Sequence, residues 1–220
     1  MKINYDKSFY MDIKNVLICD YSIPYDIFKH ANLMDIDITK LFCDNLTASK
    51  NKDALISQIL GIYGNYFATH EFIMKGYKVE NEYEVITDDK QKTKADIAYY
   101  ENDEIVLCEV KMAMQIILNK KNYVNFNNLT SKKDIVQDKR KYFEIANKLL
   151  KQVSKLKKVS NHVKVIVFEN CYMDKDLIDA LKKEGINKDD ILIIPVDVKE
   201  LYNNVKNMVE NIFLKYEKNV

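Results

Sequence analysis

The segment from residue 94 to residue 111 constrains this chain more than any other, because it is typical of a β-hairpin. Residues 95–100 (ADIAYY) and residues 106–110 (VLCEV) are two mostly apolar runs rich in strand-forming residues. Residues 101–103 (END), between them, are typical of a turn. A hairpin fixes which side chains become neighbours across its two strands, so it limits the sites that this segment can form.

Three charged residues fall close together if this hairpin forms. Side chains alternate along a strand, so Glu109 and Lys111 share one face while Cys108 points to the other. In an antiparallel pair, Asp96 can lie beside Glu109. The sequence therefore predicts two carboxylates and one ammonium group within a few ångströms of one another.

This combination suits metal-assisted chemistry on phosphate. Mg²⁺ takes one or two protein carboxylates and completes its shell with water and substrate phosphate. A lysine beside the metal can orient or deprotonate the attacking water and stabilise the charge that develops on phosphate. Charged residues two positions apart are also common on the solvated face of a strand, so the three residues alone leave a structural ion pair open as the alternative.

The elements around the hairpin follow a regular order. Residues 52–76 predict a long helix that ends at Gly76, and residues 79–86 predict a first strand. After the hairpin come a helix over residues 131–158 and a buried strand over residues 162–168. The order is helix, three strands, helix, strand. The apolar stripe of the first helix consists of Leu55, Ile56, Ile59, Leu60, Ile62, Tyr63, Tyr66, Phe67, Ile73 and Met74.

These features together resemble the PD-(D/E)xK nuclease superfamily. Asp96, twelve further residues and then Glu109-Val110-Lys111 are similar to its signature, with Ala95 in place of the proline. The resemblance implies an α/β fold of the restriction-endonuclease-like type, an α-β-β-β-α-β core with a mixed central sheet flanked by helices.

The resemblance also implies an activity, which is Mg²⁺-dependent hydrolysis of DNA phosphodiester bonds by in-line attack that leaves a 5′-phosphate. Asp96, Glu109 and the Val110 carbonyl would bind the metal, and Lys111 would assist the attacking water. Mn²⁺ is expected to substitute for Mg²⁺. DNA is the expected substrate, and an RNA-cleaving nuclease is an alternative.

The first helix also resembles the resolvase-like members of the superfamily. Residues 62–65 (IYGN) and 75–79 (KGYKV) are similar to their Gly-Glu and Gly-Tyr pattern, in which the helical acid contributes to metal binding. Asn65 stands at the position of that acid and brings no charge, although it can accept a hydrogen bond from a metal-bound water. Glu71 lies about 120° around the helix from Asn65, so it is a solvated edge residue or, alternatively, a second catalytic candidate.

The charges of the chain are strongly segregated although its net charge is only +1. Between Lys111 and Lys158 there are 13 lysines and arginines against 3 acids, which leaves 21 basic and 30 acidic residues elsewhere. A basic block that follows the motif is what a surface for the phosphate backbone requires, and a lysine-rich solvated helix face is the alternative. By resemblance to relatives that place a Gln or Lys near the scissile bond, the candidates for this contact are Gln137, Lys139, Arg140 and Lys141 in the first turns of the helix. Tyr123 and Phe126 could stack on bases or, equally, cap the core.

Outside this core, residues 1–50 predict an N-terminal extension of short helices or a strand packed on the core, and residues 51–220 the nuclease-like domain. The C-terminal part predicts a strand, a helix over residues 175–184, a strand over residues 191–196 and a helix over residues 198–215.

Composition narrows the class of protein. Four well-separated cysteines argue against a zinc site or an iron–sulfur cluster. Without a long apolar run, the sequence predicts a cytoplasmic protein with no membrane partner, and it leaves a homodimer open. The alternative to an enzyme is a nucleic-acid-binding or structural module of the same fold that has lost turnover, an option that Asn65 keeps open.

Overall fold

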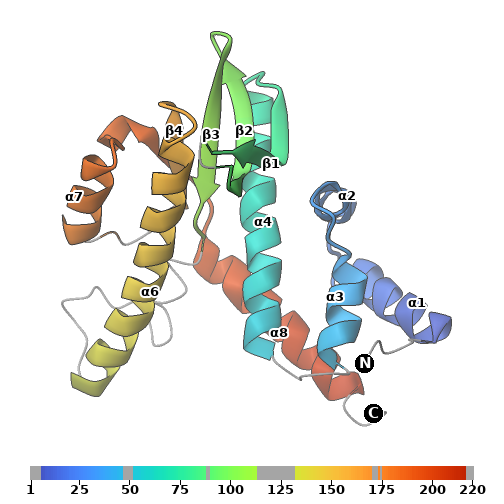
Figure 1. The fold of residues 1–220 in the computed structure, drawn as a ribbon. Coiled ribbons are helices and arrows are strands. Elements are labelled where there is room, and N and C mark those ends of the chain that lie inside the picture. The colour runs from blue at the N-terminus through green and yellow to red at the C-terminus, as the bar shows by residue number, and fades with distance from the viewer. Residues whose placement is uncertain are drawn as a thin grey trace. The chain divides into compact units, whose positions relative to one another are not determined.

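The computed structural model describes residues 6–46, 52–87, 90–112, 132–169, 173 and 175–216, without the side chains of residues 132–141. The chain divides into two compact units. Residues 1–66 and 200–220 form a helical unit, and residues 67–199 form a sheet unit. The long helix α4 (Lys52–Met74) contributes to both units (Figure 1).

In the helical unit, short helices account for the apolar runs of the N-terminal residues. Two of the many aspartates there cap helices, because Asp6 accepts a hydrogen bond from the Ser8 amide and Asp37 from the Lys40 amide. The elements are α1 (Lys7–Asn15), the π-helical turn η1 (Val16–Asp20), α2 (Tyr25–Leu33), α3 (Ile38–Asp44), the first part of α4 and most of α8 (Val198–Tyr216).

The sheet unit holds a mixed five-stranded sheet in the order β1-β2-β3-β4-β5. The first three strands are antiparallel, and β3, β4 and β5 are parallel. The strands are β1 (Val79–Ile86), β2 (Lys92–Glu101), β3 (Glu104–Val110), β4 (Val163–Phe168) and β5 (Ile191–Ile194). The crossover helices are α6 (Lys132–Lys157) and α7 (Lys175–Lys183), with a short 3₁₀ turn, η4 (Lys188–Asp190), before β5. The predicted mixed α/β class is confirmed.

Helices cover both faces of this sheet (Figure 1). On one face, α6 and α7 bury apolar side chains of β1 to β4 in a continuous cluster. On the other face, the end of α4 packs on β2, where the Phe72 and Tyr99 rings stack with centroids 4.5 Å apart. Tyr77 adds a tilted contact to Tyr99 at 4.7 Å. Such aromatic contacts fix the position of β2 in the centre of the unit.

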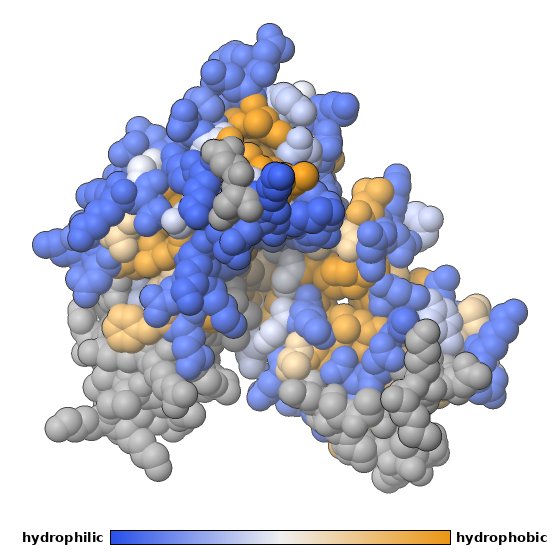
Figure 2. All heavy atoms as spheres, viewed as in Figure 1, coloured by the Kyte–Doolittle hydropathy of each residue, from blue (hydrophilic) through white to orange (hydrophobic). Residues whose placement is uncertain are grey.

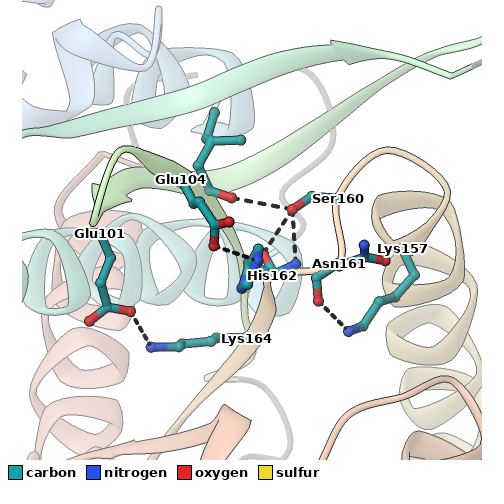
Figure 3. Close-up of polar contacts among 8 residues, drawn as sticks. Glu101, Glu104, Lys157, Ser160, Asn161, His162 and Lys164 are labelled. Carbon is teal, nitrogen blue, oxygen red and sulfur yellow. Dashed lines mark hydrogen bonds and ion pairs between the residues drawn. The ribbon is translucent and has the colours of Figure 1, made fainter.

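The predicted hairpin forms between β2 and β3. Its two turn residues, Asn102 and Asp103, have φ angles of 52° and 63°, the left-handed pair that a two-residue hairpin turn requires. Polar contacts tie this end of the hairpin to the start of β4 (Figure 3). The Glu104 carboxylate lies 2.7 Å from His162 Nε2, and Lys164 Nζ lies 3.4 Å from Glu101.

The predicted bounds of the other helices and strands agree with the structure to within a few residues. Two details differ. β2 begins at Lys92, earlier than expected, because Thr93 and Lys94 pair with β1. Ile73 and Met74 were expected on the buried stripe of the first helix but are exposed, because only its preceding turns pack against the core. No helix in the described ranges is long and apolar enough to cross a membrane. Figure 2 shows a mostly hydrophilic surface around α6 and α7, with small apolar patches.

The sheet unit provides a direct test of this packing. Ile166 on β4 is fully buried, whereas Ile193 on the adjacent strand β5 is 66% exposed. Ile166→Ala should lower the free energy of unfolding by about 2–5 kcal/mol because it leaves a cavity. Ile193→Ala should lower it by less than about 1 kcal/mol. Urea denaturation followed by circular dichroism measures both values, and equal losses would contradict the assigned faces.

Candidate functional site

Strand register brings Asp96 and Glu109 together, as the sequence predicts. Ile97 pairs with Cys108 and Ala98 with Leu107. One step further along the same antiparallel register, Asp96 on β2 lies opposite Glu109 on β3. Directly opposite side chains have Cβ atoms about 5 Å apart. The two carboxylates therefore occupy neighbouring strands at the end of the sheet away from the hairpin turn.

A side-chain hydrogen bond replaces the backbone ladder at this point. The Val110 amide donates to Asp96 Oδ2 at 2.7 Å, beyond the last backbone pair of β2 and β3. On its other edge, β3 remains paired with β4, and the Lys111 amide donates to the Ile166 carbonyl at 2.8 Å. The β2–β3 ladder thus ends at the carboxylates, and Asp96 bridges the position that the backbone leaves.

Lys111 completes the group from the end of β3. Its Nζ contacts Glu109 Oε1 and lies 3.4 Å from the Val110 carbonyl oxygen. The Glu109 side chain is only 5% exposed and that of Lys111 is 21% exposed. The ammonium group is therefore at the open side of the site, and the Glu109 carboxylate is at its buried side.

Burial dominates the electrostatics of the two acids. Burial and, to a smaller extent, the nearby charge of Asp96 raise the pKa of Glu109 to about 7, against the opposing effect of Lys111. Burial also raises the pKa of Asp96, while the Lys111 charge and the Val110 amide oppose that shift. The positive charge of Lys111 thus does not fully compensate the two carboxylates. Incomplete compensation of this kind is typical of sites that bind a cation or transfer protons.

A third acid, Glu82 on β1, belongs to the same electrostatic group and was missed in the sequence. Asn81 pairs with Ile97 and Tyr83 with Ala95, so Glu82 lies across from Asp96. Burial raises the pKa of Glu82, and the Asp96 charge adds to that shift while Lys94 opposes it. The signal in the sequence was weak, since Glu82 is one of several glutamates on a polar strand and only the register singles it out.

The helix α6 is attached to the strand that carries Asp96. The Gln152 side-chain amide donates to the Lys94 carbonyl oxygen and, at 3.3 Å, to Thr93 Oγ1. This contact places the C-terminal half of α6 next to the part of β2 that directly precedes Asp96.

Of the remaining candidates, Asn65 belongs to the other unit, Glu71 has its own partner, and the rest fall outside the described side chains. Asn65 belongs to the helical unit, where it is buried and its Oδ1 accepts no hydrogen bond from the described residues. Glu71 forms an ion pair with Lys75 at 3.0 Å, the arrangement of a solvated helix edge. The side chains of Gln137, Lys139, Arg140 and Lys141, and all of Tyr123 and Phe126, lie outside the described residues.

The donor set fits Mg²⁺ or Mn²⁺ with water in its shell. Within the described ranges, no three His, Cys, Asp or Glu side chains stand close enough to hold a metal by themselves. Mg²⁺ does not need such a cage, because one or two carboxylates suffice when water and phosphate complete the shell. Asp96 and Glu109 each use one carboxylate oxygen in the contacts described above and offer the other. The Val110 carbonyl lies beside them.

Comparison with known proteins gives no match. No protein-family model matches this chain, and no curated protein or solved structure shows significant similarity to it.

The raised pKa of Glu109 predicts a pH effect on stability. The unfolded chain ionises this group near its ordinary pKa of 4.5, whereas the folded protein does so near 7. Between these values the folded state binds more protons, so the contribution of Glu109 to stability falls as pH rises, by up to about 3 kcal/mol. Above pH 7 the loss is complete.

Glu109→Gln removes this titration. In EDTA, the difference in free energy of unfolding between the variant and the wild type should shift in favour of the variant from pH 4.5 to pH 8. Urea denaturation at the two pH values measures it. A difference that does not change with pH would contradict a raised pKa at Glu109.

Proposed function

We propose that this protein is a metal-dependent nuclease that hydrolyses DNA phosphodiester bonds at the site formed by Asp96, Glu109 and Lys111. The observation that carries the proposal is the arrangement of these residues on β2 and β3. The buried Glu109 and the half-buried Asp96, both with raised pKa, lie side by side, and Glu109 contacts the ammonium group of Lys111. A simple surface ion pair would bring neither the burial nor the second acid.

Each residue has a distinct task in this proposal. Asp96 and Glu109 bind the cation, with the Val110 carbonyl as a further oxygen donor. The bound cation would neutralise charge on the phosphate and lower the pKa of an attacking water. Lys111, which is more exposed than Glu109, would orient or deprotonate that water and stabilise the charge that develops on the phosphate oxygens. The hydrogen bond from Val110 keeps Asp96 oriented toward Glu109.

The order of the elements supports the restriction-endonuclease-like fold for this core. The C-terminal part of α4, strands β1 to β3, α6 and β4 follow one another in the α-β-β-β-α-β sequence that the resemblance implies. The two candidate acids fall on the second and third strands of that core. The DNA-cleaving activity and the 5′-phosphate product remain proposals that rest on this resemblance.

A row of lysines on α6 supports a nucleic-acid substrate. Lys148, Lys151, Lys155 and Lys158 are exposed and recur at intervals of three and four residues, so they form one stripe along α6 and its C-terminal end, termed here the lysine stripe. Gln152, which contacts the strand of Asp96, lies next to this stripe on the helix. The stripe spans about 15 Å, enough to contact several phosphates of one strand.

The catalytic assignment predicts the effect of single substitutions. Asp96→Asn and Glu109→Gln should abolish Mg²⁺-dependent cleavage because each removes a charged metal ligand. Lys111→Ala should slow it by about 10²–10³, the loss typical for one group that stabilises transition-state charge. Lys92→Ala, a change at an exposed lysine on the same sheet, is the control and should keep wild-type activity.

The assay uses plasmid, single-stranded and branched DNA with Mg²⁺ or Mn²⁺, against EDTA, and RNA as a second substrate. Wild-type cleavage in EDTA, or an Asp96→Asn protein with undiminished rate, would contradict the proposal. A folded wild-type protein that binds DNA without cleaving any substrate would favour the catalytically silent module.

The lysine stripe predicts a change in the salt dependence of binding. Each lysine that contacts a phosphate releases condensed counterion, so log K falls with log salt by about 0.9 per contact on duplex DNA. Lys151→Glu with Lys155→Glu should flatten this slope and weaken binding to every sequence alike. Lys182→Glu with Lys183→Glu on α7 makes the same charge change elsewhere and should leave the slope as it is.

Binding to one duplex at several salt concentrations, in Ca²⁺ to suppress cleavage, gives the slopes. Equal slopes for the wild type and the α6 variant would mean that the lysine stripe is only a solvated helix face. The same experiment with Lys139, Arg140 and Lys141 changed to glutamate tests the first turns of α6.

A further inference from the structure

Glu82 on β1 lies opposite Asp96 on β2. The flanking pairs, Asn81 with Ile97 and Tyr83 with Ala95, fix this position. Glu109 on β3 lies on the other side of Asp96. The three acids therefore stand in a row over three adjacent antiparallel strands, with Asp96 in the middle.

The backbone of β1 changes course at Glu82. Its φ angle is +51°, in the left-handed region that side chains other than glycine and asparagine rarely adopt. Before it, Asn81 accepts a hydrogen bond from Thr69 of α4 at 2.7 Å. After it, Tyr83 packs on the apolar cluster beneath α6 and α7. Asn81 and Tyr83 are two positions apart but face opposite sides of the sheet. The alternation of side chains along β1 therefore breaks at Glu82, next to the site.

The ion pair with Lys94 does not explain why the Glu82 side chain is less exposed than that of Glu84. Lys94 Nζ lies 3.9 Å from Glu82, and Lys92 Nζ lies 3.8 Å from Glu84 two residues further along β1. The two ion pairs are alike, yet the Glu82 side chain is 32% exposed and that of Glu84 is 57% exposed. Glu82 differs in facing Asp96, whose charge acts on it.

We propose that Glu82 is a positioning residue of the metal site, which accepts hydrogen bonds from water bound to a cation held by Asp96 and Glu109. The inference rests on the proposed function and adds to it a residue that the motif does not contain. Partners of this kind orient the ligands and bound water of a metal, and their loss typically costs 10–100-fold in metal affinity.

A role through water fits the geometry better than direct ligation. Within the described part of the chain, no three acidic side chains converge closely enough to hold one ion together. A carboxylate across one strand spacing, about 5 Å away, is within reach of the water shell of an ion bound at Asp96. The charge of Glu82 also adds to the attraction for the cation. When no cation is bound, the same charge adds to the repulsion among the acids.

The test measures Mn²⁺ binding to the full chain by isothermal titration calorimetry, without nucleic acid. Glu82→Gln should weaken Mn²⁺ binding by about tenfold or more. Glu84→Gln loses the matching ion pair on the same strand and should bind within twofold of the wild type. Without metal, Glu82→Gln should melt at the same or a higher temperature, because it relieves repulsion among the acids. A merely structural residue would not combine weaker binding with unchanged or higher stability.

A second variant guards against a folding defect. Glu82→Asn suits the left-handed backbone at this position and should lose affinity in the same way. If Glu82→Gln and Glu82→Asn bind as tightly as Glu84→Gln while Asp96→Asn does not bind, the role of Glu82 is wrong and the metal site stands. If the wild type binds no Mn²⁺, or Asp96→Asn binds it normally, the proposed function itself fails.

Discussion

The hydrogen bond from the Val110 amide to Asp96 Oδ2 is the interaction on which the candidate site depends. At 2.7 Å, it joins β2 and β3 where their backbone pairing ends. It holds Asp96 against the strand that carries Glu109 and Lys111. The parallel pairing of β3 with β4 fixes the other edge of the same strand. The site is thus built on the central strand of the sheet, at the end where its pairing with β2 stops.

The site stabilises the fold less than an apolar group at the same place would. Burial raises the pKa of both Asp96 and Glu109, so ionising them in the folded protein has a cost. Lys111 offsets part of that cost for both acids. A buried group of like charges that is only partly compensated is common at functional sites, where a ligand supplies the missing charge. In the proposal, a divalent cation supplies it.

Much of this arrangement could be predicted from the sequence, because it depends on local patterns. The turn at Asn102 follows from its residue type, and alternation along β3 sets the faces of Glu109 and Lys111. Glu82 could not be predicted, because its role depends on the register of β1 against β2 and on a left-handed backbone angle, which no local pattern specifies. The exposure of Met74 was also missed, since helical periodicity does not show where the core ends.

The release of protons on cation binding tests the central claim most directly. If a cation binds at Asp96 and Glu109, it must displace the proton that Glu109 holds near its raised pKa of about 7. Calorimetric titration with Mn²⁺ at pH 7, in buffers of different ionisation enthalpy, counts these protons. The account predicts a net release of protons on binding, which is smaller in Glu109→Gln. Binding that releases no proton in the wild type, or the same number in the variant, would contradict it.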